Sequence, residues 1–351
     1  MADMPATTVG SVSPINERRP RLGFLGVGWI GHNRMEAIAG SGLADVSMIY
    51  DASPETMQRS LASVPHAHAA SCMDELLNAD LDGIVIATPS GQHAEQAVRF
   101  LESGLAVFSQ KPLGTTADQT RRVVETARDK NKLLAVDLSY RFTAAMEATR
   151  SLISSGQLGV IYAVNLIFHN AYGPDKTWCY DRALSGGGCV IDLGIHLIDA
   201  ALWMLDFPYI KSVNSKLYSQ GQLVANHKNA IEDYAAAQID LDSGSTIHME
   251  CSWRFPAGQD CVIAMEFFGT QGAASFQNVN GSFYDFVAEH YEGPKRTRLV
   301  SPPDSWPGRA AVEWVKQLAT GQTFDVKNEE LVRVAEVLDA IYSNTPKTSL
   351  S

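Results

Sequence analysis

The stretch LGFLGVGWIGHNRMEAIAG, Leu22 to Gly40, decides the fold. A short apolar run leads into Gly26-x-Gly28-x-x-Gly31, and a segment suited to a helix follows. In a strand, turn and helix of this kind, the first glycine permits the tight turn and the second lets a pyrophosphate approach the backbone. The third lets the helix pack on the strand. Because the free N–H groups of the helix N-terminus would face the phosphates, the stretch predicts a dinucleotide-binding turn.

Asp51 ends the next apolar run, VSMIYD, about twenty residues after Gly31, where an acidic side chain is expected to meet the adenosine ribose. A carboxylate there accepts hydrogen bonds from the ribose diol and repels a 2′-phosphate, so NAD is favoured over NADP. The alternative is that Asp51 caps a helix beginning at Pro54. Its coincidence with the glycine pattern favours the cofactor role.

Short β-rich runs alternate with helical stretches from Arg21 to Arg141, which is typical of a parallel sheet covered on both faces. Farther along, the apolar runs are joined by the turn-like segments DSG and GTQG, which predict hairpins. We therefore expect α/β followed by α+β. The predicted parts are a flexible tail (1–20), a Rossmann domain (21–141), a substrate and oligomerisation domain with a large, mostly antiparallel open sheet (142–326) and an amphipathic C-terminal helix (327–345).

The composition narrows the class of protein. A chain of 351 residues suggests two domains, and 45% hydrophobic with 19% charged residues is ordinary for a soluble globular protein. A net charge of -11 argues against a nucleic-acid partner. The apolar runs are too short for a bilayer span or a signal peptide, so no membrane partner is expected. Five cysteines without a C-x-x-C pair favour a reducing, cytoplasmic setting, and no metal-ligand spacing is present.

A second cluster of polar residues lies in LSGGGCVIDLGIHLIDAALWML. If the chain is helical from Gly188 onward, Asp192 and His196 are four residues apart and share one face. An imidazole is suited to removing a proton from an alcohol near neutral pH, and a nearby carboxylate would orient it. Taken alone, such a pair is more often a surface or helix-stabilising contact.

The ordered motifs GVGWIG, ATPSGQHAEQA, QKPL and GGGCVIDLGIHLID carry a family resemblance. From about Arg21 to Ser343 the sequence resembles the glucose–fructose oxidoreductase, inositol dehydrogenase and rhizopine catabolism family. The resemblance implies a Rossmann domain, a second domain with a large open sheet, and a nicotinamide in the cleft between them. It also implies NAD(P)-dependent interconversion of an alcohol and a ketone on a sugar, cyclitol or related polyol.

By position, the resemblance makes Lys111 the active-site lysine that contacts the reacting hydroxyl, with Asp192 and His196 as the helix pair. His196 would be the general base for oxidation or the general acid for reduction. Gln110 departs from the family, which usually has glutamate before the lysine and proline. The residues expected at the cofactor are Gly26, Gly28, Trp29, Ile30, Gly31, Asp51, Thr88, Pro89, His93, Gln110 and Lys111.

The second domain is expected to supply specificity. Tyr140 and Arg141 follow the last Rossmann strand, while Asp175 and Trp178 lie in a loop before the catalytic helix. Hydroxyl-binding side chains beside aromatic rings suit a polyol; the alternative is a solvated loop whose aromatics pack on the domain. Trp253 is expected in the sheet, where family members often bury one face against another subunit as a homodimer or homotetramer.

Three functions compete. The preferred one is a cytoplasmic NAD-dependent dehydrogenase of a sugar, cyclitol or sugar derivative. The second keeps NAD tightly bound and recycles it during redox-assisted elimination or glycoside cleavage. The third is a non-catalytic NAD-binding redox regulator, which the intact set of Lys111, Asp192 and His196 disfavours, since a sensor needs no base beside the nicotinamide.

Overall fold

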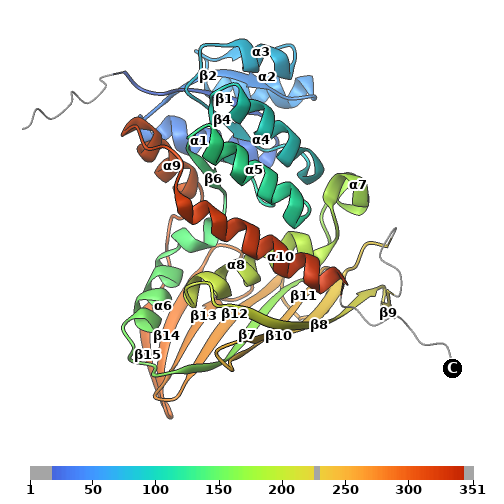
Figure 1. The fold of residues 1–351 in the computed structure, drawn as a ribbon, viewed down its shortest axis with the longest axis vertical. Helices are drawn as coiled ribbons and strands as arrows, with labels where there is room; N and C mark the ends of the chain where they lie inside the picture. Colours follow the sequence, from blue (N-terminus) through green and yellow to red (C-terminus); the bar gives the residue numbers. More distant parts are fainter. Residues whose placement is uncertain (1–17, 225–229, 344–351) are drawn as a thin grey trace, which may run out of the picture.

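The computed structural model describes residues 18–224 and 230–343. It has two layered parts (Figure 1). In the upper part of the view, helices cover a parallel sheet. In the lower part, a larger sheet carries helices on one face, and the long helix α10 (Glu329–Ser343) runs between the two.

The first sheet has the strand order β3-β2-β1-β4-β5-β6 and is parallel throughout. The order reverses between β1 and β4, and ligands bind at the carboxyl ends of strands at such a switch point. The predicted Rossmann domain is confirmed. Its strands are β1 (Arg21–Leu25), β2 (Asp45–Tyr50), β3 (His68–Ala69), β4 (Gly83–Ile86), β5 (Ala106–Ser109) and β6 (Leu134–Val136). Its helices are α1 (Trp29–Ser41), α2 (Pro54–Ser63), α3 (Met73–Asn78), α4 (His93–Glu102) and α5 (Ala117–Asp129).

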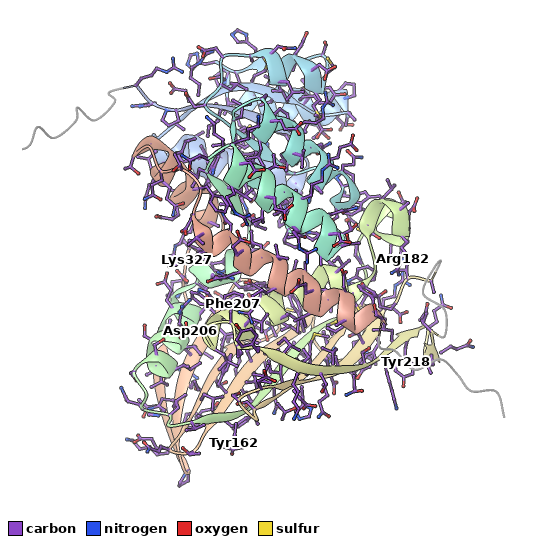
Figure 2. The ribbon with its side chains drawn as sticks, viewed as in Figure 1. Tyr162, Arg182, Asp206, Phe207, Tyr218 and Lys327 are labelled. Atoms are coloured by element: carbon purple, nitrogen blue, oxygen red, sulfur yellow. The ribbon has the colours of Figure 1, made fainter. Side chains whose placement is uncertain are left out.

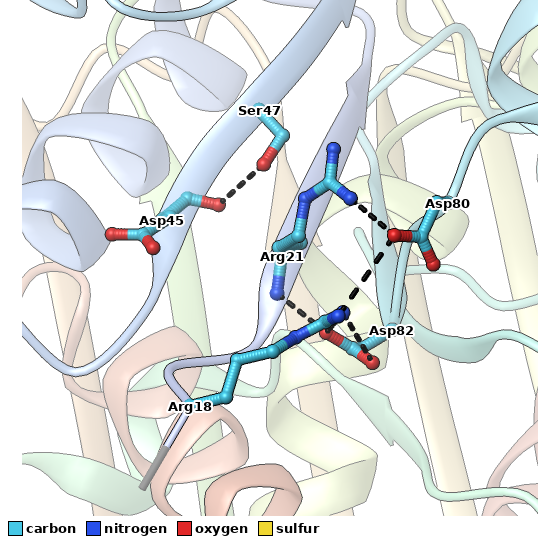
Figure 3. A network of polar contacts seen from close by, with 6 residues as sticks. All are labelled: Arg18, Arg21, Asp45, Ser47, Asp80 and Asp82. Carbon is cyan, nitrogen blue, oxygen red and sulfur yellow. Dashed lines mark hydrogen bonds and ion pairs between the residues drawn. The ribbon is translucent and has the colours of Figure 1, made fainter.

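Ion pairs and hydrogen bonds fix the chain just before β1 (Figure 3). Arg18, inside the range predicted as a tail, donates to Asp82 at 3.2 Å, and the backbone N–H of Arg21 donates to the same carboxylate at 2.7 Å. The Arg21 guanidinium pairs with Asp80. The entry to β1 is thus tied to the entry to β4; residues 1–17 of the predicted tail lie outside the described residues.

The second sheet has nine strands in the order β15-β14-β13-β12-β7-β11-β10-β8-β9. Only β7 and β11 pair in parallel among the described strands, so the mostly antiparallel prediction is confirmed. Its strands are β7 (Ile161–Asn170), β8 (Ile210–Ser219), β9 (Gln222–Leu223), β10 (Tyr234–Leu241), β11 (Thr246–Ser252), β12 (Cys261–Gly269), β13 (Ala273–Asn278), β14 (Phe286–Glu292) and β15 (Lys295–Val300). Its helices are α6 (Ala144–Ser154), α7 (Arg182–Ser185) and α8 (Ile195–Met204).

Helices α6 and α8 cover one face of this sheet (Figure 1). Along β12 the burial alternates, with Ile263, Met265 and Phe267 fully buried between partly exposed neighbours. The alternation arises because successive side chains of a strand point to opposite faces. The other face of the sheet is left open, and the open face carries partly exposed side chains such as Tyr218, labelled in Figure 2.

The last two helices join the two parts of the protein. Helix α9 (Arg309–Ala319) lies within the range predicted for the second domain, yet it packs on the Rossmann sheet, where Trp314 contacts Phe108 at 5.7 Å between ring centroids. Helix α10 packs between α5 and α8 (Figure 1). Arg333 of α10 donates to the carbonyl oxygens of Phe207, labelled in Figure 2, and Pro208.

Five strands were not expected from the sequence: β3, β8, β9, β14 and β15. Strands β3 and β9 have two residues each, too few to produce a pattern. Strand β15 is an edge strand with the sequence KRTRLV, whose side chains stay largely exposed. Edge strands are commonly rich in charge because charge opposes aggregation, so they lack the apolar signal used for prediction.

Candidate active site

The glycine turn between β1 and α1 has the geometry that its three glycines predict. Gly26 has a φ of 86°, and a Cβ there would lie 2.7 Å from backbone atoms of Ala87. A Cβ on Gly31 would lie 2.2 Å from the carbonyl oxygen of Gly26. At Gly28, a Cβ would meet no atom of the described residues within 4 Å. The two outer glycines are therefore required for close packing of the turn, while the middle one leaves room for a phosphate beside the helix N-terminus.

Asp51 lies at the end of β2 and braces this turn. Its carboxylate accepts hydrogen bonds from the backbone N–H groups of Val27 and Ser53, both at 2.8 Å. The N-cap of α2 is Ser53, whose hydroxyl accepts from the N–H of Thr56. The alternative in which Asp51 itself caps α2 does not occur, and its carboxylate faces a cleft.

This cleft has a volume of about 930 Å³ and reaches from the glycine turn to the second domain. Trp29, the first residue of α1, is 61% exposed at its wall. The first domain also contributes Gly26, Gly28, Ile30, Asp51, Thr88, Pro89 and Gln92. The second domain contributes Asp175, Lys176 and Trp178. The open glycine, the free helix N-terminus and the acidic residue fit a dinucleotide. Asp175 and Trp178, expected at the substrate, line this cofactor cleft.

His93 and Gln110 lie behind the cleft wall, with 1% and 9% exposure. The two ring nitrogens of His93 lie 2.7 Å from the carbonyl oxygens of Thr88 and Pro112. Burial lowers the pKa of His93. The ring therefore ties the Thr88 loop to the turn after Lys111.

Lys111 follows β5 and reaches across to the second domain. Its Nζ donates to the backbone oxygen and to Oδ1 of Asp192, both at 2.8 Å. The other carboxylate oxygen, Oδ2, accepts from the indole N–H of Trp253 at 3.0 Å. Although burial opposes it, the Lys111 ammonium, followed by the Trp253 N–H, lowers the pKa of Asp192. The ammonium and the carboxylate thus form an ion pair between the domains.

The segment that carries Asp192 is a π-helix, η4 (Val190–Gly194), which leads into α8. We expected Asp192 and His196 to share one face at α-helical spacing. In the structure the segment from Val190 to Gly194 is a π turn, and the Asp192 carboxylate contacts Lys111 and Trp253. The contacts within 18–224 and 230–343 include no hydrogen bond between Asp192 and His196, so the carboxylate orients the lysine and not the imidazole.

Three consecutive glycines allow this segment to enter the core. Oε1 of the buried Glu232 accepts from the N–H groups of Gly188 and Val190, at 2.8 and 3.1 Å, and from the Tyr342 hydroxyl at 2.8 Å. A Cβ on Gly188 would lie 1.9 Å from the Glu232 carbonyl oxygen, and one on Gly187 would lie 2.0 Å from the Tyr342 hydroxyl. Protein atoms therefore fill the space around this glycine turn.

His196 lies one turn further on, at the start of α8. Burial, followed by the Lys111 ammonium, lowers the pKa of His196 to about 3, against the opposite effect of Asp192. The imidazole is therefore neutral near pH 7. The Tyr140 ring meets it edge-on at 4.9 Å between centroids, so the structure brings these two predicted site residues together.

Arg141 is placed differently from Tyr140. Its guanidinium forms a bidentate pair with Asp199, with 2.9 and 2.5 Å between nitrogen and oxygen atoms, and lies over the Trp203 ring. The Asp199 side chain is only 4% exposed. We expected Arg141 to face the substrate; the structure gives it a partner in the core of the second domain.

The 3-10 helix η3 (Thr177–Tyr180) links the cofactor cleft to the ion pair. Trp178 lines the cleft, and the next residue, Cys179, lies near Asp192 and Lys111. Burial, and then Asp192, raise the pKa of the Cys179 thiol to about 11. Cys179, one residue along η3 from the cleft wall, therefore lies close to the charged pair.

Sequence reasoning missed Trp253 and Glu232 as parts of the site. Trp253 was expected to belong to the sheet, but β11 ends at Ser252 and the indole turns to Asp192. A tryptophan just after a strand was the signal available. Glu232 gave no local signal, because it acts on a segment far away in the sequence.

In residues 18–224 and 230–343, no group of three or more His, Cys, Asp and Glu side chains could hold a metal ion. In the same ranges, the stretch Arg182–Met204 is long and apolar enough to cross a bilayer by length and composition. It contains α8, and 83% of its most apolar window is buried inside the protein.

A Rossmann cofactor cleft, a lysine–aspartate pair between domains and a neutral histidine define a dinucleotide-dependent oxidoreductase of two domains. Two family models agree with this class. Residues 21–138 match the oxidoreductase family with an NAD-binding Rossmann fold, and residues 146–275 match the GFO/IDH/MocA C-terminal domain. The chain belongs to the GFO/IDH/MocA oxidoreductase family.

Named relatives act on sugars and related compounds. D-glucoside 3-dehydrogenase of Escherichia coli is 29% identical over 57% of this chain, and the match spans 60% of that protein's length. Rhizopine catabolism protein MocA of Rhizobium meliloti is 28% identical over 73% of this chain and 78% of its own. D-xylose 1-dehydrogenase (NADP(+)) 2 of Haloferax volcanii is 29% identical over 87% and 94%.

Solved structures share the fold. Levoglucosan dehydrogenase in complex with NADH and levoglucosan superposes with a TM-score of 0.80 at 20% identity, covering 93% of this chain and 97% of its own. GenD2 from gentamicin A biosynthesis, in complex with NAD, has a TM-score of 0.79 at 22% identity, covering 96% and 97%. The shared fold therefore extends over nearly the whole chain.

Proposed function

We propose that this protein is an NAD-dependent oxidoreductase that interconverts a secondary alcohol and a ketone on a sugar, cyclitol or sugar derivative. The observation that carries the proposal is the Lys111–Asp192 pair, with both contacts at 2.8 Å, beside a neutral His196. A cation and a free base next to a cofactor cleft are what alcohol oxidation requires.

Bound NAD would supply the acceptor, at C4 of its nicotinamide, for the hydride that leaves the carbinol carbon. Residues of the protein bind the reacting hydroxyl and transfer its proton. The ammonium of Lys111 stabilises the negative charge that develops on the substrate oxygen. His196 takes the hydroxyl proton in oxidation and returns it in reduction. Asp192, held by the Trp253 indole, fixes the position of the Lys111 ammonium.

Asp51 supports NAD as the preferred cofactor. Its two hydrogen bonds to the backbone leave further acceptor sites on the carboxylate for a ribose diol, and a 2′-phosphate would meet its negative charge. Replacing it by Asp51→Ser should narrow the preference for NAD over NADP, measured as the ratio of the two dissociation constants.

Several features support a polyol substrate. Next to His196, the Tyr140 ring lies within 5.5 to 6.1 Å of the rings of Trp306, Phe286 and Phe168. These three rings are buried in the core and hold the partly buried Tyr140 beside His196. The Tyr140 ring is therefore the aromatic face that could cover the C–H surface of a sugar while nearby polar groups bind its hydroxyls. Asp175 and Trp178, at the cofactor cleft, would meet the substrate only where it approaches the nicotinamide, and the Arg141–Asp199 pair argues for a structural role of that arginine.

We also propose that the protein is cytoplasmic and self-associates through the open face of the second sheet. Half-buried Ile167, Val262 and Ala264 lie on that face of adjacent strands β7 and β12. Apolar side chains on an exposed face favour a protein partner. Sedimentation of the protein and of an Ala264→Glu variant tests this; a monomer at micromolar concentration would contradict it.

A substrate screen tests the enzyme function. Monosaccharides, inositols and glycosides are offered with NAD, and release of NADH is followed in the steady state. Lys111→Ala and His196→Ala should each lower kcat/KM by about a hundredfold or more. Exposed Lys130→Ala and His66→Ala are matched controls. Unchanged turnover in the first two variants contradicts the proposal, and product without NADH release would indicate a recycled cofactor.

A further inference from the structure

A buried charged cluster lies directly behind the active-site lysine. Arg34 of α1, Asp137 and Ser139 after β6, and Gln110 after β5 are 1–9% exposed. The Arg34 Nε donates to Asp137 Oδ2 at 2.6 Å, and the Gln110 side-chain amide donates to the same oxygen at 2.5 Å. The Ser139 hydroxyl donates to the other oxygen and accepts from Arg34 at 3.1 Å. One guanidinium and one carboxylate thus balance each other away from water.

Two of the three partners of the carboxylate, Gln110 and Ser139, lie next to a residue that faces the catalytic helix. Gln110 immediately precedes Lys111, whose Nζ holds Asp192. Ser139 immediately precedes Tyr140, whose ring contacts His196. Arg34 belongs to the helix that begins at the glycine turn. The cluster therefore joins the cofactor helix to the two segments that carry Lys111 and Tyr140.

We propose that Gln110, Asp137 and Arg34 form a charge-balanced positioning unit for Lys111 and Tyr140, in which position 110 must carry an uncharged hydrogen-bond donor. The family usually has a glutamate at this position. An uncharged glutamine fits here because Asp137 already supplies the one carboxylate that the Arg34 guanidinium neutralises. The inference rests on the proposed function only for its turnover readout.

A second carboxylate at position 110 would be costly. The Gln110 amide nitrogen now lies 2.5 Å from Asp137 Oδ2 and donates a hydrogen bond to it. A glutamate would place a second acceptor oxygen there, and one guanidinium would have to balance two negative charges. Burial and the like charge of Asp137 would raise the pKa of the introduced carboxyl, and the Lys111 ammonium would oppose this only in part because Asp192 pairs with it. His93, the other titratable group beside Gln110, has a lowered pKa and adds no positive charge.

The experiment compares Gln110→Glu, Asp137→Asn and the double variant Gln110→Glu/Asp137→Asn. Exposed Gln58→Glu on α2 is the matched control for the charge change. Thermal unfolding, the NADH dissociation constant and the pH profile of kcat are measured for each, between about pH 6 and pH 8, where an unpaired buried carboxyl is expected to titrate.

Gln110→Glu should lose about 4 °C or more in melting temperature at the alkaline end and recover toward the acid end, where the introduced carboxyl is protonated. Its kcat should fall about tenfold at the alkaline end with a smaller change in KM, because a displaced lysine affects the transition state most. The double variant should recover part of both losses. Recovery is partial because an asparagine at position 137 has one acceptor oxygen in place of two.

Two results would overturn the inference: a Gln110→Glu variant that matches Gln58→Glu at every pH, or a double variant no better than Gln110→Glu. If the wild-type protein turns over no polyol, the proposed function fails. The melting temperatures and their pH dependence still decide the positioning unit in that case.

Discussion

The protein contains two glycine-rich turns that lead into helices, and their surroundings are opposite. In the first, Gly28 faces open space at the cofactor cleft. In the second, Gly187 and Gly188 face the Tyr342 hydroxyl and the Glu232 backbone at contact distances that exclude any side chain. The first turn leaves space for a ligand at Gly28, and the second gives the N–H groups of Gly188 and Val190 to a buried carboxylate. A glycine motif alone does not distinguish a binding turn from a packing turn.

Adding a methyl group to the packing turn should have the largest effect. Gly188→Ala would place a Cβ 1.9 Å from the Glu232 carbonyl oxygen, so the segment carrying Asp192 must shift. We expect a loss of about 3 kcal/mol or more in the free energy of unfolding, measured by denaturant titration. Exposed Gly40→Ala in α1, where a Cβ meets no described atom, is the control. A Gly188→Ala protein of wild-type stability would contradict the packing role.

The packing turn leads into the helix that carries His196, and this histidine should make the free energy of unfolding depend on pH. Because the pKa of His196 is lowered to about 3, the unfolded chain binds a proton that the folded protein excludes once the pH falls below the ordinary histidine value. Stability is therefore lost as the pH falls from about 6.5 toward 3, by up to about 2 kcal/mol at pH 5. His196→Gln should remove this part of the pH dependence of unfolding. An identical pH dependence in both proteins would mean that His196 titrates normally in the fold.

The same methyl group in the binding turn should spare the fold. Gly28 has a φ of -57°, which alanine adopts freely, and no described atom lies where the Cβ would be. Gly28→Ala should unfold at the wild-type denaturant concentration but bind NADH about tenfold more weakly, which is about 1.4 kcal/mol. Fluorescence titration with NADH measures this. Equal affinity would show that the turn does not hold the pyrophosphate.

The smallest effect is expected for a substitution that keeps the hydrogen bonds of the packing turn and removes the charge of Glu232. All three hydrogen bonds to Glu232 end on Oε1, which a glutamine also offers, so Glu232→Gln should cost about 1 kcal/mol. Burial raises the pKa of Glu232, so its stabilising contribution is greatest at acid pH and is lost as the pH rises through that raised value. The deficit of Glu232→Gln should therefore shrink with rising pH in denaturant titrations. A deficit that grows instead would contradict this sign.

Much of the site could be predicted from local sequence patterns, but the residues that contact the site residues could not. Several site residues lie at strand or helix ends that short sequence motifs mark. The structure places the glycine turn, Asp51 and Lys111 at one edge of the Rossmann sheet and His196 at the start of α8. The pairing of Asp192 with Lys111 was not predicted, because it depends on a π turn and on an approach between residues 81 positions apart. Arg141 illustrates the same limit: its position after a strand suggested the cleft, whereas Asp199 holds it in the core.

The sequence by itself determined the class of the two domains, the cofactor turn and the identity of the lysine, aspartate and histidine. The domains and the turn follow from periodicity and turn chemistry, which act over a few neighbouring residues, whereas the lysine, aspartate and histidine are the ones that the family resemblance implies. The tertiary structure alone decided which glycine turn stays open, which carboxylate holds the lysine and which carboxylate accepts from Gln110 beside it. Those outcomes depend on atoms that meet across the fold, where burial makes each unpaired charge and each displaced methyl group costly.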